Sequence, residues 1–124
     1  MIGLMVLLAN VSLAQSSVLD TTRNWTSDEN IELYSGQTLS DTFLITINST
    51  GLTLQSGDIT KNFQVENIQG AWTNLTETGY LDFEIPLPGF KGKGRLQNDG
   101  EVLSLTIDFS ERKDWMKRKF IINQ

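Results

Sequence analysis

The 124-residue sequence contains neither cysteine nor histidine. Without histidine, the chain lacks the commonest general base, the Ser-His-Asp and Cys-His arrangements, and most zinc and copper sites. Without cysteine, it has no thiol chemistry and no disulfide bonds, so a folded domain depends on its hydrophobic core. No Gly-x-Ser-x-Gly motif, phosphate-binding loop or dinucleotide-binding fingerprint is present. We therefore expect a protein that is not an enzyme and needs no metal or cofactor.

Long helical patterns are also missing. Alanine is scarce, proline occurs twice, and threonine, serine, asparagine and glycine are abundant, which favours strands and turns. No amphipathic stretch of about twelve residues separates the strand-like segments, so parallel βαβ units are not expected. The length is sufficient for one domain with its own core.

The clearest structural signal lies in the segment 79–109. Apolar and polar residues alternate in Leu81–Ile85 and again in Leu103–Phe109, which indicates two strands with one buried and one exposed face. A third strand is expected between them at Gly94–Gln97, followed by a hairpin turn at Asp99–Gly100. This segment therefore predicts three antiparallel strands.

Short strand-like runs separated by frequent turns fill most of the remaining chain. Ser110, Glu111 and Asp114 favour a single helical turn before the last strand. We expect an all-β fold, a single antiparallel β-barrel or β-sandwich of about eight strands with at most one short helical turn. The expected strands are Ile31–Tyr34, Thr42–Asn48, Leu52–Gln55, Phe63–Ile68, Ala71–Leu75, Tyr80–Ile85, Gly94–Gln97, Val102–Phe109 and Lys119–Ile122.

One apolar run, Ile2–Leu8, lies at the N-terminus and is too short to span a bilayer. Ser12-Leu-Ala14 places small residues at the two positions that a signal peptidase reads. Residues 1–14 are therefore predicted to be a signal peptide, with Gln15 as the mature N-terminus; the alternative is a buried N-terminal strand. The prediction places the protein in the periplasm or outside the cell, and an exported chain without disulfides favours a bacterial protein.

The mature chain divides into two expected parts. Residues 15–30 are polar and are predicted to be an extended lead-in, with a weak strand at Val18–Leu19. Trp25 is expected to fold back onto the body of the protein. Residues 31–124 are predicted to form the antiparallel β domain.

The net charge of −5 is unevenly distributed. Residues 1–90 carry ten acidic and two basic residues, a charge of −8, whereas residues 91–124 carry five acidic and eight basic residues, a charge of +3. The acidic balance argues against nucleic acid as the main partner. The basic segment has the composition to face a phosphate, a lipid headgroup or a polyanion, although a solvated surface is the preferred interpretation.

Charged residues suggest three possible sites. Asp82 and Glu84 are expected on one strand face, roughly 7 Å apart, a separation at which two carboxylates can hydrolyse glycosides. A cluster of Asp28, Glu29 and Glu32 offers calcium ligands without a complete ligand loop. The segment Phe90–Arg95 has the glycines and cations of an anion-binding loop. In each case the preferred interpretation is structural: an exposed strand face, surface acids and a flexible hairpin entry, respectively.

The five tryptophan and tyrosine residues have the chemistry to stack on a sugar or to close a pocket, although aromatic residues in small β domains more often belong to the core. They are Trp25, Tyr34, Trp72, Tyr80 and Trp115.

Gly70-Ala-Trp72, Gly79-Tyr-Leu-Asp-Phe83 and Trp115-Met-Lys-Arg118 together resemble small exported lipocalin-like bacterial proteins. In that family a Gly-x-Trp motif lies on a barrel strand, and an arginine of the last strand packs over the tryptophan. The resemblance implies that Trp72 plugs the barrel with Arg118 as its partner. It also implies a cup-shaped barrel with a small apolar ligand at its open end.

The leading functional hypothesis is non-catalytic binding of a small hydrophobic ligand by an exported protein without a membrane span. The first alternative is a structural or protein-interaction module without such a ligand, and a more distant one is a carbohydrate-active protein. The oligomeric state is not predicted. The residues expected to contact the ligand are Phe43, Ile45, Trp72, Tyr80, Phe83, Leu105 and Trp115.

Overall fold

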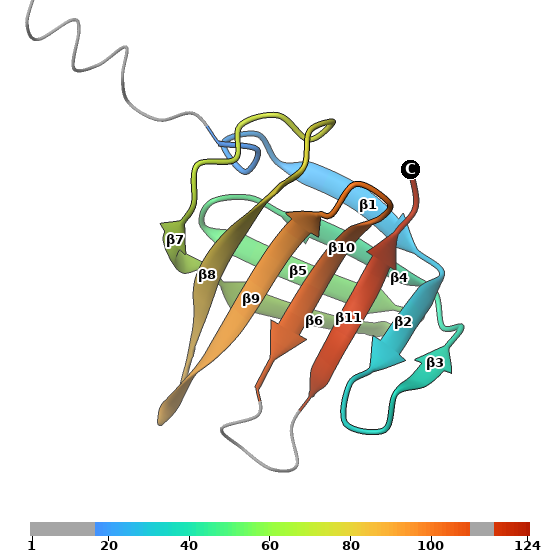
Figure 1. Cartoon of the computed structure of the whole chain (residues 1–124). Helices are drawn as coiled ribbons and strands as arrows, with labels where there is room; N and C mark the ends of the chain where they lie inside the picture. Colours follow the sequence, from blue (N-terminus) through green and yellow to red (C-terminus); the bar gives the residue numbers. More distant parts are fainter. Residues whose placement is uncertain (1–16, 110–115) are drawn as a thin grey trace, which may run out of the picture.

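The computed structural model describes residues 17–109 and 116–124, and in this part of the chain eleven strands form two antiparallel sheets (Figure 1). The smaller sheet has the order β1-β4-β5-β6, and the larger has the order β3-β2-β11-β10-β9-β8-β7. The strands are β1 (Arg23–Ser27), β2 (Glu29–Glu32), β3 (Gln37–Leu39), β4 (Phe43–Ile47), β5 (Gly51–Ser56), β6 (Ile59–Gln64), β7 (Glu66–Gln69), β8 (Gly79–Leu87), β9 (Phe90–Asn98), β10 (Leu103–Asp108) and β11 (Lys117–Ile122).

The chain passes between the sheets at two abrupt corners. Only Asp28 separates β1 from β2, and only Val65 separates β6 from β7, yet the members of each pair belong to different sheets. Strands that change sheet at a bend are typical of sandwiches whose sheets cross at a steep angle. In Figure 1 the strands of the smaller sheet cross behind those of the larger one. The all-β expectation is confirmed, and because the sheets do not close into a barrel, the architecture is a sandwich.

The three strands expected between residues 79 and 109 are confirmed as β8, β9 and β10. They pair as consecutive antiparallel neighbours, and β11 continues the meander and pairs with β2. Turns at Gly89 and Gly100 connect β8 to β9 and β9 to β10, and both glycines have positive φ. The predicted alternation places one face of these strands in the core, with the buried side chains of Leu81, Phe83, Ile85, Leu96, Leu103, Leu105 and Ile107.

Glycines in β9 make room for aromatic rings. Gly92 and Gly94 face the core, and a Cβ at either position would lie 2.2 Å from ring atoms of Phe109 or Phe83, respectively. A residue larger than glycine at position 92 or 94 would therefore force the neighbouring ring to move. The anion-binding loop considered for Phe90–Arg95 is therefore wrong: the segment is a strand whose glycines are packing sites.

Several strand predictions need correction. Ala71–Leu75 forms no strand, Val18–Leu19 lies in a turn, and the run expected at Phe63–Ile68 is divided between β6 and β7. β1 and β3 were not expected, and β1 lies inside the segment 15–30 that was interpreted as a lead-in. The missed strands β1 and β3 arise where pairing between distant segments, and not local alternation, makes the strand.

Trp72 closes one end of the sandwich from a loop. Its ring is buried over Gly79, its Nε1 donates to the carbonyl of Glu77 at 3.0 Å, and its carbonyl accepts from Val18 N. Gly79 aligns across the sheet, through β9 and β10, with Ile122 at the C-terminal end of β11. The opposite end of the sandwich is therefore the one at which β11 begins.

Two predictions fall outside the described residues: the signal peptide at 1–14 and the helical turn at 110–115. None of the described residues belongs to a helix with the length and hydrophobicity of a membrane span.

Candidate binding sites

A pocket of about 520 Å³ opens between the two sheets, at the end opposite Trp72. Its apolar wall consists of Phe43 from β4, Leu54 from β5, Ile59 from β6 and Met116, which directly precedes β11. Phe43 packs edge-on against the buried ring of Phe120, with the ring centroids 4.9 Å apart. The smaller sheet therefore supplies three of the four apolar side chains and Met116 supplies the fourth, and the volume lies within the usual range for a small-molecule site.

Charged groups surround this wall. Lys61, Lys117 and Arg118 supply positive charge, and Glu32 and Asp41 supply negative charge. Lys117 already faces Asp108, with Nζ 3.8 Å from the carboxylate.

Glu32 is engaged by the turn that follows its own strand. Its carboxylate accepts hydrogen bonds from Ser35 Oγ at 2.6 Å, Ser35 N at 2.7 Å and Tyr34 N at 3.0 Å. These bonds, those from Ser35 foremost, hold the pKa of Glu32 below its ordinary value, with a smaller contribution from Arg118. The Glu32 oxygens are therefore directed to the β2–β3 turn.

Asn30 lies behind Arg118 and is fully buried. Its Oδ1 accepts a hydrogen bond of 3.1 Å from Arg118 Nη1, while its Nδ2 has no hydrogen-bond partner among the described residues. Leaving a buried donor without a partner costs about 1–3 kcal/mol, and such groups are uncommon in folded proteins. The unsatisfied donor therefore lies in the interior behind Arg118, and of the two residues only Arg118 lines the pocket.

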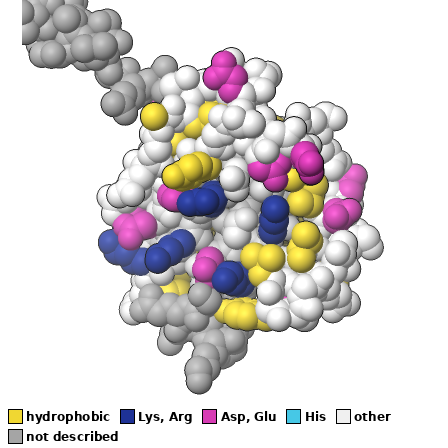
Figure 2. All heavy atoms as spheres, viewed as in Figure 1, with side chains coloured by type: hydrophobic (Ala, Val, Ile, Leu, Met, Phe, Trp, Pro, Cys, Tyr) yellow, Lys and Arg dark blue, Asp and Glu magenta, His cyan; other side chains and the backbone are white. Residues whose placement is uncertain are grey.

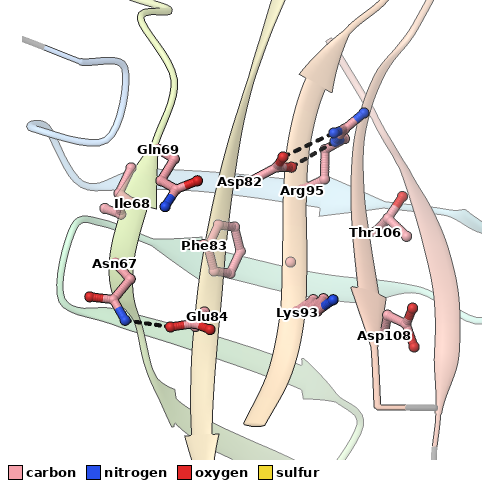
Figure 3. Close-up of a pocket in the computed structure, with 11 residues that line it drawn as sticks. Asn67, Ile68, Gln69, Asp82, Phe83, Glu84, Lys93, Arg95, Thr106 and Asp108 are labelled. Carbon is pink, nitrogen blue, oxygen red and sulfur yellow. Dashed lines mark hydrogen bonds and ion pairs between the residues drawn. The ribbon is translucent and has the colours of Figure 1, made fainter. Parts of the chain in front are cut away.

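A second hollow, a groove of about 710 Å³, lies on the outer face of the larger sheet (Figure 3). Figure 2 shows this face, on which acidic, basic and hydrophobic side chains are intermixed. Asp82 on β8 and Arg95 on the neighbouring β9 form a bidentate ion pair in the groove, with N–O distances of 2.7 and 2.9 Å. The Arg95 guanidinium also lies 4.2 Å above the Tyr80 ring centroid. The bond to Asp82 raises the pKa of Arg95, so this pair is mutually satisfied.

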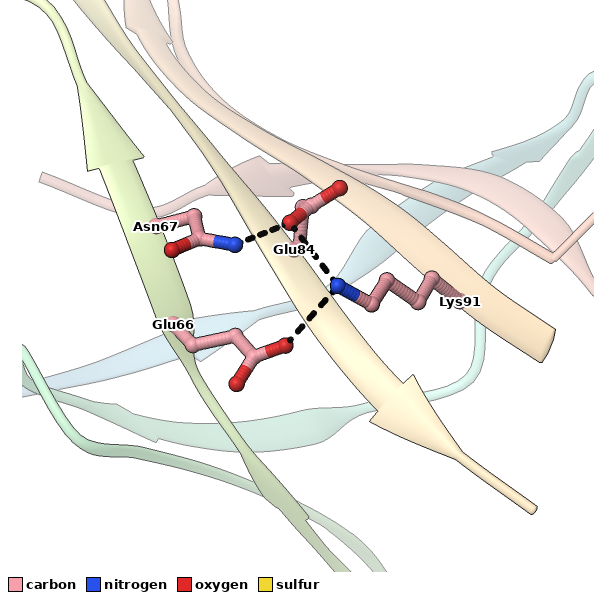
Figure 4. Close-up of polar contacts among 4 residues, drawn as sticks. All are labelled: Glu66, Asn67, Glu84 and Lys91. Atoms are coloured by element: carbon pink, nitrogen blue, oxygen red, sulfur yellow. Dashed lines mark hydrogen bonds and ion pairs between the residues drawn. The ribbon is translucent and has the colours of Figure 1, made fainter. Parts of the chain in front are cut away.

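Glu84 belongs to a separate cluster beside β7 (Figure 4). Asn67 Nδ2 donates to Glu84, and Lys91 Nζ lies 3.6 Å from Glu84 and 3.5 Å from Glu66. The hydrogen bond from Asn67, followed by the charge of Lys91, lowers the pKa of Glu84. A general acid in glycoside hydrolysis requires the opposite shift. Asp82 and Glu84 thus lie on one face as predicted, but each carboxylate is held by different partners.

The other sites considered from sequence are not assembled. Asp28 accepts hydrogen bonds from Thr42 and Asn123, and no three carboxylates gather as a potential metal site within residues 17–109 and 116–124. The aromatic residues are dispersed. Trp25 packs against the core, Tyr34 lies in the β2–β3 turn, and Tyr80 lies on the outer sheet face.

Of the residues predicted to contact a ligand, Phe43 lines the pocket between the sheets. Ile45, Phe83 and Leu105 are fully packed core residues, Trp72 lies at the other end, and Tyr80 lies outside. Trp115 is outside the described residues. Arg118 lies at the end of the sandwich opposite Trp72 and donates to Asn30, so the Trp72–Arg118 contact implied by the lipocalin-like resemblance is not formed.

Sequence reasoning missed Leu54, Ile59 and Met116 as residues of the pocket. One signal was available for Arg118. It precedes the buried Phe120 by two positions on a strand, so a period of two places both on the inner face.

Comparison with protein-family models, curated proteins and solved structures finds no match.

Proposed function

We propose that the protein is an exported, non-catalytic binding protein that holds a small, largely apolar ligand in the pocket between its two sheets. The observation that supports this proposal is the apolar wall at one end of the sandwich, formed by the smaller sheet and Met116. The remaining core residues fill the interior, so the ligand would occupy this end in the manner of the cup implied by the lipocalin-like resemblance.

Ile59 marks the mouth of the pocket. Its side chain is 65% exposed although it lies beside Leu54 and Phe43, and an apolar ligand would remove this surface from water. Each Å² of apolar surface so covered contributes about 25 cal/mol to binding.

The proposal is tested with N-phenyl-1-naphthylamine, an uncharged dye whose fluorescence rises in apolar surroundings. We expect saturable binding that Ile59→Lys weakens by about tenfold or more, because the new ammonium group lies at the mouth. Leu44→Lys is the matched control, since Leu44 is 49% exposed on β4 but does not line the pocket. Equal binding by both variants, or none by the parent protein, would refute the proposal.

Export is tested separately by measuring the intact mass of the protein recovered from its natural host. A mature chain that begins at Gln15 agrees with the proposal, whereas a mass that retains residues 1–14 contradicts it.

The groove on the larger sheet supports a second candidate, a protein-interaction module. Side chains of opposite charge lie across from each other on β8 and β9: Asp82 pairs with Arg95, and Glu84 is aligned with Lys93. A charged partner on this exposed face would bind less tightly as salt is raised from 0.05 to 0.5 M. Arg95→Gln would weaken such binding and leave dye binding in the pocket unchanged.

A further inference from the structure

We infer that the free edge of β6 binds an extended segment of another protein, which pairs with β6 as an added strand and places an acidic residue opposite Lys61. Apolar residues two positions before and after this acid would lie opposite Ile59 and Phe63. The inference goes beyond the small-ligand site proposed above and does not depend on it. It rests on a strand whose backbone is open on one side and on a lysine that has no ion pair among the described residues.

The two sheets of the described chain have four edge strands, and three of them are protected against an added strand. β3 has only three residues, which is short for pairing. β7 is irregular, since Asn67 has a positive φ and the register with β8 shifts. At β1, the carbonyl of Thr26 already accepts a hydrogen bond of 2.8 Å from Asn123 N. Short, bulged or covered edges are the usual means by which proteins prevent strand addition.

β6 has none of these features. It is six residues long, it pairs with β5 without a break in register, and it is the outermost strand of the smaller sheet (Figure 1). Within the described part of the chain, its backbone forms no hydrogen bonds apart from those to β5. Alternate residues of such a strand direct an N–H and a C=O away from the sheet, so an added strand would find a regular row of partners.

The side chains on the inner face of β6 define the pattern of the partner. Ile59, Lys61 and Phe63 lie on this face, because Lys61 and Phe63 are aligned with the buried Leu54 and Leu52 of β5. Ile59 is more exposed than any other large hydrophobic side chain described. In an added strand, the residues opposite these three would point to the same face, with Cβ atoms about 5 Å away. Apolar residues opposite Ile59 and Phe63 would remove their exposed surface from water.

Lys61 determines the charge at the centre of this pattern. On β5 it is aligned with Leu54, which carries no charge. The two acids that line the pocket beside it, Glu32 and Asp41, form no ion pair with it, and Glu32 is held by the β2–β3 turn. Opposite charges directly across two antiparallel strands stabilise the pair, and like charges destabilise it. An acidic residue opposite Lys61 therefore complements this edge.

A second copy of the chain fits the same edge poorly. In the antiparallel register that pairs most of β6 with itself and keeps the inner faces together, the two Lys61 side chains would lie directly opposite each other. Lys61 thus disfavours self-association and favours a different, acidic chain.

Three fluorescein-labelled peptides test the inference on the unmodified protein by fluorescence polarisation. The first is Thr-Val-Thr-Glu-Thr-Val-Thr, the second has lysine in place of glutamate, and the third is the glutamate peptide with N-methyl groups on the residues between its two valines. We expect saturable binding of the glutamate peptide, binding of the lysine peptide that is weaker by about fivefold or more, and none of the N-methylated peptide. No binding of the glutamate peptide, equal affinity for glutamate and lysine, or equal affinity after N-methylation would overturn the inference.

Variants locate the charge. Lys61→Glu is expected to reverse the preference, so that the lysine peptide binds more tightly than the glutamate peptide. Lys119→Glu is the matched control and should keep the original preference, because β11 is paired on both sides, with β10 and β2. Should Lys61→Glu fold poorly, Lys61→Gln is expected to abolish the preference. A preference for glutamate that survives either substitution of Lys61 would refute the assignment.

Amide hydrogen exchange of the unmodified protein locates the backbone contact. The glutamate peptide is expected to slow exchange in β6 and to leave β1, the opposite edge of the same sheet, unchanged. Slower exchange in β1 and not in β6 would place the peptide at another edge and overturn the inference.

Discussion

Gly94→Ala tests how tightly β9 packs against its neighbour. An alanine Cβ would lie 2.2 Å from Cε2 and Cζ of Phe83, and 2.9 Å from Cδ2, so the ring must move. Overpacking a filled core costs about 1–3 kcal/mol. Replacement of glycine inside a strand returns only about 0.5–1 kcal/mol through the unfolded chain. We therefore expect Gly94→Ala to lower the free energy of unfolding by about 1 kcal/mol, the difference between the midpoints of these two ranges.

The cause is isolated in a double-mutant cycle measured by urea unfolding, followed by tryptophan fluorescence. Leucine at position 83 lacks the ring atoms that the new methyl group would meet. In the Phe83→Leu background, Gly94→Ala should therefore be neutral or stabilising. Gly51→Ala is the control, because Gly51 also lies in a strand but its added Cβ would be 3.7 Å from the nearest atom, so no neighbour has to move.

The packing account fails if Gly94→Ala is as stable as the parent protein. It also fails if the cost of Gly94→Ala is the same with phenylalanine and with leucine at position 83, because the ring would then not be the obstacle.

Three further measurements address the core, the surface and the pH dependence. Phe83→Ala should cost about 3–5 kcal/mol in urea unfolding, and a loss well below 1 kcal/mol would show that this ring is not a packed core residue. Arg95→Gln should cost less than about 1 kcal/mol, because its ion pair with Asp82 is half exposed; a loss above 2 kcal/mol would contradict this estimate. The lowered pKa of Glu32 stabilises the fold above the unfolded-state pKa, and this contribution disappears as pH falls through the folded-state value. Glu32→Gln should therefore flatten the decline of the urea midpoint between about pH 5 and 3, and an unchanged decline would exclude that contribution.

The segment from Gly79 to Phe109 was predictable because local signals agree there. Alternation defines the buried face, and glycine at the turns fixes the hairpins. β1 lacks this agreement, since polar residues occupy most of Arg23–Ser27. Its pairing with β4, about twenty residues away along the chain, makes it a strand, and single-sequence patterns do not report such contacts.

The choice between barrel and sandwich was beyond local inference for a related reason. The corner at Val65 falls inside the expected strand Phe63–Ile68, in which Phe63 and Val65 alternate with Gln64 and Glu66. The backbone of β7 is irregular next to this corner: Asn67 has a φ of 53° and the register with β8 shifts. The apolar pattern breaks only after the corner, where Asn67 takes the position of an expected apolar residue and Ile68 is out of phase, so Val65 itself fits an uninterrupted strand.

The contact between Asn30 and Arg118 was beyond local inference for the same reason. Asn30 and Arg118 lie 88 residues apart in sequence and meet only because β11 pairs with β2. Phe43 could be predicted as a ligand contact from its apolar character, whereas the burial of an asparagine within the acidic segment Asp28–Glu32 could not be predicted.

Asn30 is a poor choice for stability alone. A leucine at a fully buried position would gain hydrophobic burial and would avoid the cost of about 1–3 kcal/mol for an unpartnered amide donor. Replacing a polar pair by apolar residues of similar volume is often neutral or stabilising, while removing one partner is costly. Asn30→Leu/Arg118→Met should therefore unfold at a urea concentration equal to or above that of the parent, and Arg118→Met should unfold below it. If the double variant is as stable as this, stability alone does not account for the pair. A double variant less stable than Arg118→Met alone would instead make the pair a structural element of the fold.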